Sequence, residues 1–458
     1  MVPPPDPKQE LAAAFGRRCP HHSHSLGLIQ IYLRVVLNCA VGFRGAAAVL
    51  QVAALLFPTD ERAPSPNGGQ MWLLRLGLYM LSRPKEQADD WVWIIDHTIQ
   101  IGPLKCLIVV GVRLSAWESK RADPHQSSAL AHHDLSVWLI KPMAHSDGEA
   151  VRDALVDLSQ TSGVIPCEIA SDCGADLEKG INLFCSGRAT RRVKDIAHAA
   201  ANAVKQELNG NTQWEAFLRE ASHAKAKMRQ TKFAFLLPPE LKAKARWMNL
   251  DALVTWSRKA IGFVQAPRPV PGVSWEDDEL EEKMGWIRGY QEPLAAWSQL
   301  LEVVATVLTY AREHGYHPHA KQELQVELSS FTAQIQTPAC RVAKRLLAFV
   351  DEESAGIADG RRLVASSEVL ESLIGKAKQL EGSQSKGGFT KTVLGLAASV
   401  AKVTEENIRT ALNATKVQDV IDWVREHLGM SLEAQRHHAF KPQPCGTKLA
   451  STAADAVN

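Results

Sequence analysis

The sequence has no C-x-x-C pair, although it contains eight cysteines. Several cysteines fall in apolar runs that are typical of buried strands, which favours free thiols in a reducing, cytosolic compartment over a disulfide framework. A long unbroken apolar segment is also missing. The most apolar early stretch, 26–57, is interrupted by Arg34 and Arg44, and residues 1–10 have no basic region before an apolar core. We therefore expect no membrane span and no signal peptide.

An excess of charge of one sign is missing as well. Lys and Arg together number 52 and Asp and Glu number 50, which leaves a net charge of +2 over 458 residues. The overall balance therefore neither indicates nor excludes a nucleic-acid partner, and the distribution of charge has to decide. A chain of this length exceeds one typical hydrophobic core, so several domains or a heavily inserted domain are expected.

The N-terminal region is expected to be a flexible tail followed by helices. Residues 1–25 are rich in proline and hold a Cys/His cluster without apolar periodicity, which favours a solvated tail over a metal site. Residues 26–88 contain three segments of helical periodicity, the pattern of a helix-turn-helix-like DNA-binding region. Its last helix would contact DNA through Trp72, Arg75 and Arg83, although an ordinary helical bundle has the same pattern.

Residues 89–208 carry the pattern of the first part of an α/β core with a mixed sheet. The expected order is three apolar strands, a helix, a fourth strand and a further helix, at 91–96, 106–114, 135–140, 148–160, 164–170 and 189–208. Asp96 ends the first strand and Asp172 directly follows the fourth. If these two strands are neighbours, both carboxylates reach the same edge of the sheet.

The middle of the chain, 209–361, changes to tryptophan-rich helical periodicity without strand alternation, which predicts a large all-α insertion. Lys and Arg are dense from 225 to 258, and such a face suits phosphates. A solvated helix surface is the commoner explanation of a charge run, and tryptophans at helical spacing are ordinarily core residues. The C-terminal part of the core is expected at 362–440, and a second flexible tail at 441–458.

A returning helix at 366–378 supplies the third acidic candidate. Glu371 and Lys378 are seven residues apart, nearly two helical turns, so they project from one face. Two aspartates and a glutamate provide the hard oxygen ligands of two Mg²⁺ or Mn²⁺ ions, which catalyse phosphodiester cleavage by neutralising the attacking and leaving oxygens. Lys378 would bind a DNA phosphate as a point charge.

The assignment of the acidic ligands has local alternatives. Asp176 and Asp195 compete with Asp172 for the second position, and we choose Asp172 because it directly follows the fourth strand. Glu368 competes with Glu371, and we choose Glu371 because only it has a lysine seven residues later. The predicted catalytic and metal-binding residues are therefore Asp96, Asp172 and Glu371.

At these residues the chain resembles bacterial insertion-sequence transposases of the Asp-Asp-Glu type, in the subgroup with a large helical insertion between the second Asp and the Glu. The resemblance extends from about His22 to Phe440. The segments that carry it are 89–98, 170–180, 195–198 and 370–378.

The resemblance implies an RNase H-like catalytic core with Mg²⁺ or Mn²⁺. It implies double-stranded DNA as partner, with terminal inverted repeats recognised by the N-terminal helices, and a homodimer in the DNA-bound synapse. The corresponding location is the bacterial cytoplasm, at the nucleoid. Some related groups have Tyr and Arg seven and four residues before the glutamate. This chain has Val364 and Ser367 there, which argues against a hairpin-forming cleavage route.

The expected function is that of a DNA transposase, which cleaves the ends of its element and joins them to target DNA. Two other classes are consistent with the sequence. A nuclease or recombinase on the same core would cut without joining, and a non-catalytic DNA-binding or helical scaffold protein would do neither.

Overall fold

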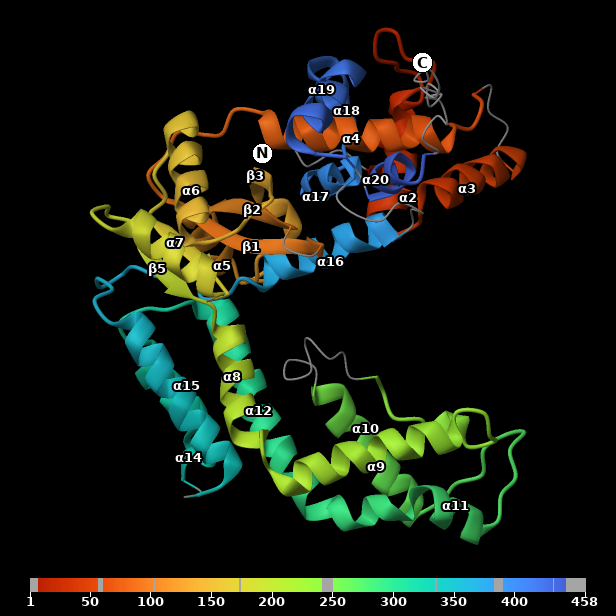
Figure 1. The fold of residues 1–458 in the computed structure, drawn as a ribbon, viewed down its shortest axis with the longest axis vertical. Helices are drawn as coiled ribbons and strands as arrows, with labels where there is room; N and C mark the ends of the chain where they lie inside the picture. The colour runs from red at the N-terminus through yellow and green to blue at the C-terminus, as the bar shows by residue number, and fades with distance from the viewer. Residues whose placement is uncertain are drawn as a thin grey trace, which may run out of the picture. The chain divides into compact units, whose positions relative to one another are not determined.

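The computed structural model describes residues 7–56, 61–101, 104–172, 174–240, 250–333, 336–382, 390–430 and 432–441. Within these ranges the chain is mixed α/β, with a five-stranded sheet and many helices (Figure 1). The chain divides into two compact units. The helical unit comprises 1–82, 99–106 and 375–458, and the sheet unit comprises 83–98 and 107–374.

The helical unit is arranged around α4 (Pro66–Ser82), which packs against helices from both ends of the sequence. The other helices are α1 (Pro7–Ala14), α2 (Leu26–Asn38), α3 (Phe43–Leu56), α17 (Leu394–Ala398), α18 (Glu405–Ala414), α19 (Val417–His427) and α20 (Leu432–Ala439), with a 3-10 turn at Lys391–Val393 before α17. Helices α4 and α17 approach closely because Gly77 has no side chain. A Cβ atom at Gly77 would lie 2.1 Å from the carbonyl oxygen of Leu394.

The N-terminal segment is more ordered than the sequence predicts. The three helices expected between 26 and 88 are present, but residues 7–25 are not a tail in this structure. They form α1, which packs on α2, and a loop closed by a backbone bridge between Arg18 and Ser25. Cys19 is buried in this loop, and Ser25 caps α2 by accepting a hydrogen bond from the Leu28 amide. The segment is short and polar, so its order comes from nonlocal packing.

The sheet unit contains a mixed sheet with the strand order β3-β2-β1-β4-β5. The strands are β1 (Trp91–Ile101), β2 (Leu104–Arg113), β3 (Ser136–Met143), β4 (Glu168–Ser171) and β5 (Arg191–Lys194); the tip of the β1–β2 connection, 99–106, is assigned to the helical unit. Strand β4 pairs in parallel with β1 on one side and with β5 on the other. The first and fourth strands are therefore neighbours, as the sequence analysis expected.

One face of the sheet is covered by α6 (Gly148–Ser162) and α7 (Ala175–Cys185), which pack side by side. A single buried cluster joins these helices to the strands; it includes Trp91, Trp93, Ile95, Val109, Trp138, Val151, Leu155, Ile169, Ile181 and Phe184. The alternate residues Trp91, Trp93 and Ile95 of β1 belong to this cluster, so they lie on the face of the sheet that α6 and α7 cover. A further helix, α5 (Leu114–Ala122), follows β2.

The predicted helix at 189–208 is wrong in its first third. Residues 191–194 form β5, and the helix α8 (Ile196–Leu208) begins only after Asp195, which caps it. Strand β5 has the sequence Arg-Arg-Val-Lys. Its single apolar residue, Val193, lies at helical spacing from the apolar residues of α8, so the sequence pattern extended the predicted helix over the strand. Helix α8 packs against α12 (Gln291–His314) and α15 (Pro338–Ser354).

The predicted helical insertion is confirmed as helical in its described residues. Besides α12 and α15 it contains α9 (Thr212–Met228), α10 (Leu250–Gln265), α11 (Asp277–Met284), α13 (Ala320–Glu327), α14 (Ser329–Thr332) and 3-10 turns at Ala234–Leu236 and Gly285–Tyr290. Trp214 and Trp297 are buried and meet edge to face, with Phe217 against both rings. These tryptophans are core residues; Trp247 lies outside the described residues.

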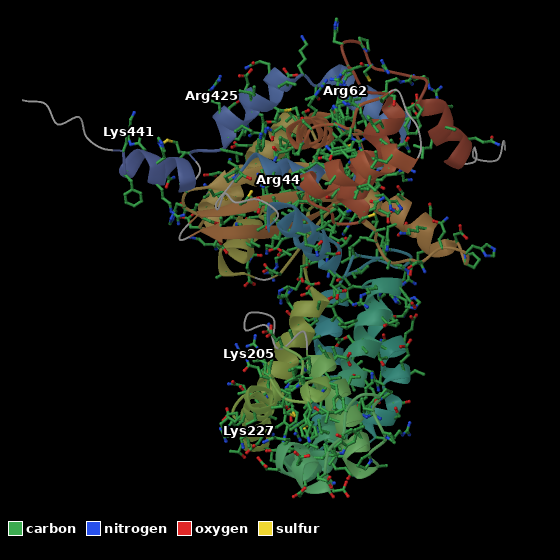
Figure 2. All side chains as sticks on the ribbon, turned by 90° about the vertical axis from the view of Figure 1, so that its right-hand side faces the viewer. Arg44, Arg62, Lys205, Lys227, Arg425 and Lys441 are labelled. Carbon is green, nitrogen blue, oxygen red and sulfur yellow. The ribbon has the colours of Figure 1, made fainter. Side chains whose placement is uncertain are left out.

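The basic run from 225 to 258 is largely a solvated surface where it is described. Lys225 pairs with Glu240 at 2.9 Å, and Lys232 pairs with Glu279 at 2.6 Å. Lys227 is exposed on α9 (Figure 2). Both acidic partners come from the same helical region, so the charges of Lys225 and Lys232 are neutralised locally.

One helical stretch, 277–314, is long and apolar enough to pass a length and composition test for a membrane span. Its main helix is α12, whose apolar residues Leu300, Val303 and Val307 are fully buried. Since α12 packs against α8, α10 and α15, its apolar character is that of a core helix.

The predicted C-terminal part of the core, 362–440, belongs to the sheet unit only as far as Ile374. Helix α16 (Glu368–Gly382) begins in the sheet unit, and the chain from Gly375 onward is part of the helical unit. There α17, α18 and α19 pack on α4. The predicted tail at 441–458 lies outside the described residues apart from Lys441.

Candidate functional site

Strands β1 and β4 place Asp96 and Asp172 next to each other. The parallel register pairs Ile95 with Ser171, and each aspartate is the next residue along its strand direction. Asp172 directly follows β4, as expected, whereas β1 continues beyond Asp96 to Ile101. Both aspartates are partly buried. Two carboxylates are thus held at one position of the sheet by backbone pairing alone.

The segment before α16 runs along the same part of the sheet unit. Leu363 forms two backbone hydrogen bonds with Tyr316, of 2.9 and 3.0 Å. The carbonyl of Ala365 accepts from the amide of Ile196 at 3.0 Å, and the amide of Val364 donates to the side chain of Glu168 at 3.2 Å. Residues 363–367 are therefore attached to β4 and to the start of α8, and they bring the first turn of α16 to the two aspartates.

Glu371 in the first turn of α16 completes the carboxylate group. Burial, together with the negative charges of Asp172 and Glu371, raises the pKa of Asp96 to about 7. Burial also raises the pKa of Glu371, while His198 opposes this shift. The charges of Asp172 and Glu371 therefore act on Asp96, while the strand pairing places the two aspartates beside each other.

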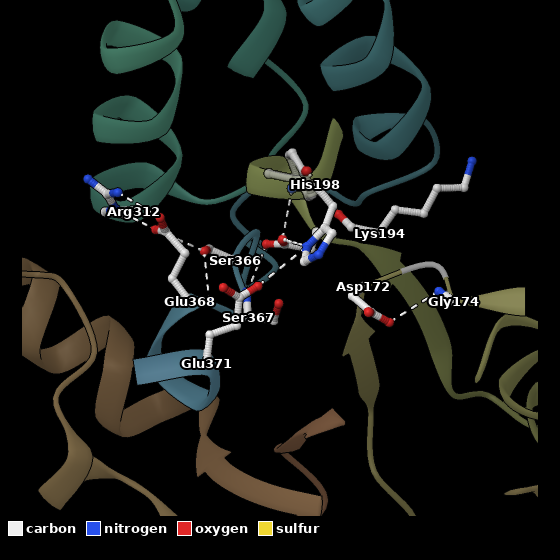
Figure 3. A network of polar contacts seen from close by, with 11 residues as sticks. Asp172, Gly174, Lys194, His198, Arg312, Ser366, Ser367, Glu368 and Glu371 are labelled. Carbon is white, nitrogen blue, oxygen red and sulfur yellow. Dashed lines mark hydrogen bonds and ion pairs between the residues drawn. The ribbon is translucent and has the colours of Figure 1, made fainter. Parts of the chain in front are cut away.

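His198 on α8 lies between two carboxylates (Figure 3). Its Nδ1 is 2.7 Å from Oδ2 of Asp195 and 3.5 Å from Oε1 of Glu371. The hydrogen bond to Asp195 raises the pKa of His198 to about 9, with added effects of the Asp195, Glu371 and Asp172 charges. One potential ligand atom from each of Asp195, His198 and Glu371 lies within 4.8 Å of the others.

The structure separates the competing acidic candidates. Asp176 accepts a hydrogen bond from Ser146 at 2.9 Å and is 3.7 Å from His97. Glu368 receives a bidentate pair of hydrogen bonds from Arg312, of 2.6 and 2.8 Å (Figure 3). Asp195 caps α8 with a fully buried carboxylate. These contacts engage all three alternatives. Asp172 is engaged as well, because its Oδ1 accepts from the amide of Gly174 at 3.1 Å, and the potential ligand atoms that lie within 4.8 Å of one another belong to Asp195, His198 and Glu371.

A cavity of about 730 Å³ adjoins the site. Glu371 forms part of its wall, together with Trp117, His132, Arg312 and Glu368. The apolar remainder of the lining comes from α5, α12, the segment before α16 and the loop before β3. This cavity therefore provides space for a substrate next to Glu371.

The two residues of α4 that were predicted to contact DNA are buried. Trp72 is 6% exposed and Arg75 is 8% exposed. The Arg75 guanidinium donates to the carbonyls of Leu412 and Thr415, two residues of the C-terminal helical segment. The prediction that Trp72 and Arg75 contact DNA is therefore wrong for this structure, because α4 is a core helix of the helical unit.

The other two predicted DNA contacts remain accessible. Arg83 is partly exposed directly after α4, and Lys378 is exposed on α16, two turns beyond Glu371. No described contact of either side chain tests a role in DNA binding.

Two residues of this region were not proposed from the sequence as parts of the site. His198 follows Asp195 in a helix-capping pattern, so the Asp-x-x-His spacing was an available signal for a capped helix with a histidine in its first turn. Glu168 is fully buried within β4, and burial raises its pKa to about 8. The sequence feature that could have identified Glu168 is a charged residue inside an apolar strand.

No protein-family model matches the chain, and no curated protein sequence matches it.

Proposed function

We propose that the protein is a DNA transposase of the Asp-Asp-Glu type with an RNase H-like catalytic core. The observation that carries this proposal is the meeting of Asp96 and Asp172, on neighbouring parallel strands, with Glu371 from a helix that follows a large helical insertion. The strand order, in which the first and fourth strands are adjacent, supports the same core.

The donor set fits two divalent cations. The three acids are close enough to raise the pKa of Asp96, and Oε1 of Glu371 is buried without a hydrogen bond among the described residues. Clustered oxygen ligands of this kind suit Mg²⁺ or Mn²⁺. Asp96, Asp172 and Glu371 would together hold the ions. When bound, the ions supply charge neutralisation for phosphodiester cleavage and strand transfer.

Double-stranded DNA is the proposed partner, as terminal repeats and as target, with a homodimer in the synapse. Arg83 and Lys378 are the proposed phosphate contacts, and both are at least partly exposed. The cavity beside Glu371 offers space for the DNA strand at the cleavage position. The proposed location is the bacterial nucleoid.

A nuclease or recombinase on the same core is the second candidate. The carboxylate geometry supports metal-dependent cleavage, and this step is common to both functions. Joining to a target is supported only by the resemblance to insertion-sequence transposases. The two functions therefore differ in one measurable product.

The test uses the full chain with labelled duplexes made from the DNA that flanks its gene, a supercoiled target plasmid, and Mg²⁺ or Mn²⁺. We expect cleavage and joining by the unaltered protein and neither by Asp96→Asn, Asp172→Asn or Glu371→Gln. Asp147→Asn, in an exposed cap of α6, is the control that retains both. Cleavage without joining would identify a nuclease, and cleavage by Asp96→Asn would contradict the proposed site.

A further inference from the structure

We infer that Asp195 and His198 are positioning residues that hold Glu371 in place for its metal ion. The inference rests on the proposed function, because it assigns Glu371 as a ligand. It concerns side chains that do not themselves bind the ion. The contacts of Asp195 link three separate parts of the sheet unit.

Asp195 is a junction between β4, α8 and the segment before α16. Its backbone amide donates to the carbonyl of Ser171 at 3.1 Å, directly before Asp172. Oδ2 accepts from the His198 amide at 3.0 Å and contacts its ring at 2.7 Å, and Oδ1 accepts from the amide of Ser367 at 2.9 Å. The side chain of Asp195 has no exposed surface. Both of its oxygens are therefore engaged in holding other groups.

His198 extends this junction to the Glu371 carboxylate. Its Nδ1 is hydrogen-bonded to Asp195 at 2.7 Å, and the same atom lies 3.5 Å from Oε1 of Glu371, which is an ion-pair contact without a hydrogen bond. A glutamate side chain has several rotatable bonds, and confining it costs conformational entropy. The Glu371 side chain is 32% exposed and borders the cavity, so a fixed partner restricts the positions open to its carboxylate.

The first turn of α16 offers a comparison within the same helix. Glu368, three residues earlier in the same turn, is held by Arg312 instead of by a histidine. The two glutamates are thus directed to different partners, and only Glu371 is held beside Asp96 and Asp172. The pairing with His198 explains how one of two acids in the same turn is selected for the site.

These contacts point to positioning and not to a separate metal site. The Asp195 oxygens already accept from backbone amides of α8 and of the segment before α16, and Nδ1 of His198 is taken up by Asp195. Partners that orient a metal ligand in this way typically change metal affinity by about 10- to 100-fold when they are removed.

The experiment measures Mn²⁺ binding to the full chain by electron paramagnetic resonance. We expect two ions in the unaltered protein. Asp195→Asn and His198→Ala should weaken the binding of the ion that Glu371 holds by about 10- to 100-fold, while the other ion stays bound. His198→Gln should recover part of this affinity because the glutamine amide can still donate to a carboxylate. No nitrogen coupling to Mn²⁺ is expected.

Asp147→Asn is the matched control. Asp147 also caps a helix of the sheet unit, accepting from the amides of Glu149 and Ala150, and it also pairs with a histidine, His145, at 3.0 Å. The pair is exposed and no contact joins it to Glu371 among the described residues. This variant should bind both ions as the unaltered protein does.

Hydrogen exchange in the metal-free protein supplies a second readout. We expect faster exchange of amides 366–372 in Asp195→Asn than in Asp147→Asn. Unchanged exchange together with unchanged Mn²⁺ affinity would overturn the inference and leave the proposed function intact, as would a nitrogen coupling that made His198 a ligand. Faster exchange in a protein whose unaltered form binds no Mn²⁺ would overturn the proposed function and, with it, the positioning role.

Discussion

The Oδ1 atom of Asp195 accepts a hydrogen bond of 2.9 Å from the backbone amide of Ser367, 172 residues away along the chain. Both groups are buried. A buried hydrogen bond to a charged acceptor is stronger than one between neutral groups, and leaving either partner unpaired is costly. This contact therefore fixes the start of α16 at the end of β5, where Glu371 meets the two aspartates.

Divalent cations should stabilise the sheet unit through Asp96. A ligand that binds only the folded state stabilises it by about 2.7 kcal/mol at 100 times its dissociation constant. We expect Mn²⁺ to raise the melting temperature of the unaltered protein and of Asp147→Asn, but not that of Asp96→Asn. Differential scanning calorimetry measures this, and an equal rise in Asp96→Asn would place the ions elsewhere.

Glu168 should make stability depend on pH. Its pKa is about 8 in the folded protein, mainly through burial, and 4.5 in the reference state. Between these values the folded state binds a proton that the unfolded state lacks, so stability falls as pH rises from about 4.5 to about 8. The total change is on the order of a few kcal/mol.

Glu168→Gln should remove this part of the pH dependence and be more stable than the unaltered protein at pH 8. Glutamine keeps an acceptor for the Val364 amide, which Glu168 binds at 3.2 Å. Urea unfolding at pH 5 and pH 8 measures the difference, with exposed Glu215→Gln as control. The same pH slope in Glu168→Gln and in the control would refute the prediction.

Gly77 should tolerate no side chain. A Cβ there would lie 2.1 Å from a backbone oxygen of α17, so α4 and α17 have to separate. Gly77→Ala is expected to destabilise the helical unit by about 1–3 kcal/mol. Gly262→Ala is the control, because a Cβ at Gly262 of α10 meets nothing within 4 Å. That change should stabilise its helix by up to about 1 kcal/mol. Denaturant unfolding compares the two, and equal stability of both variants would contradict this packing.

Substitution of Arg75 should lower the stability of the protein, whereas substitution of Arg83 should weaken DNA binding. Arg75→Met leaves the carbonyls of Leu412 and Thr415 without their donor, and should lower stability by about 2–3 kcal/mol. Arg83→Ala should instead weaken binding to a DNA duplex. The dependence of the binding constant on salt concentration should fall by the equivalent of about one phosphate contact. Urea unfolding and fluorescence anisotropy at several salt concentrations separate the effects. A loss of DNA affinity in folded Arg75→Met, at unchanged stability, would restore Arg75 as a DNA contact.

The sequence by itself determined the elements whose stabilisation is local or strongly patterned. The apolar run before Asp96, the strand before Asp172 and the tryptophan-rich helices of the insertion all follow from periodicity. The proposal of Asp96, Asp172 and Glu371 as ligands came from the position of each aspartate at the end of its strand and from the lysine seven residues after Glu371, and it stays a prediction.

The tertiary structure decided what depends on distant partners. Strand β5 has one apolar residue and exists because β4 pairs with it, so periodicity assigned those residues to a helix. Helix α4 was expected to read DNA, but its surface is covered by segments more than 300 residues away, including the carbonyls that bind Arg75. The hydrogen bond from the Ser367 amide to Asp195 likewise forms only after β5 and the start of α16 have met, because no local pattern encodes a hydrogen bond across such a separation.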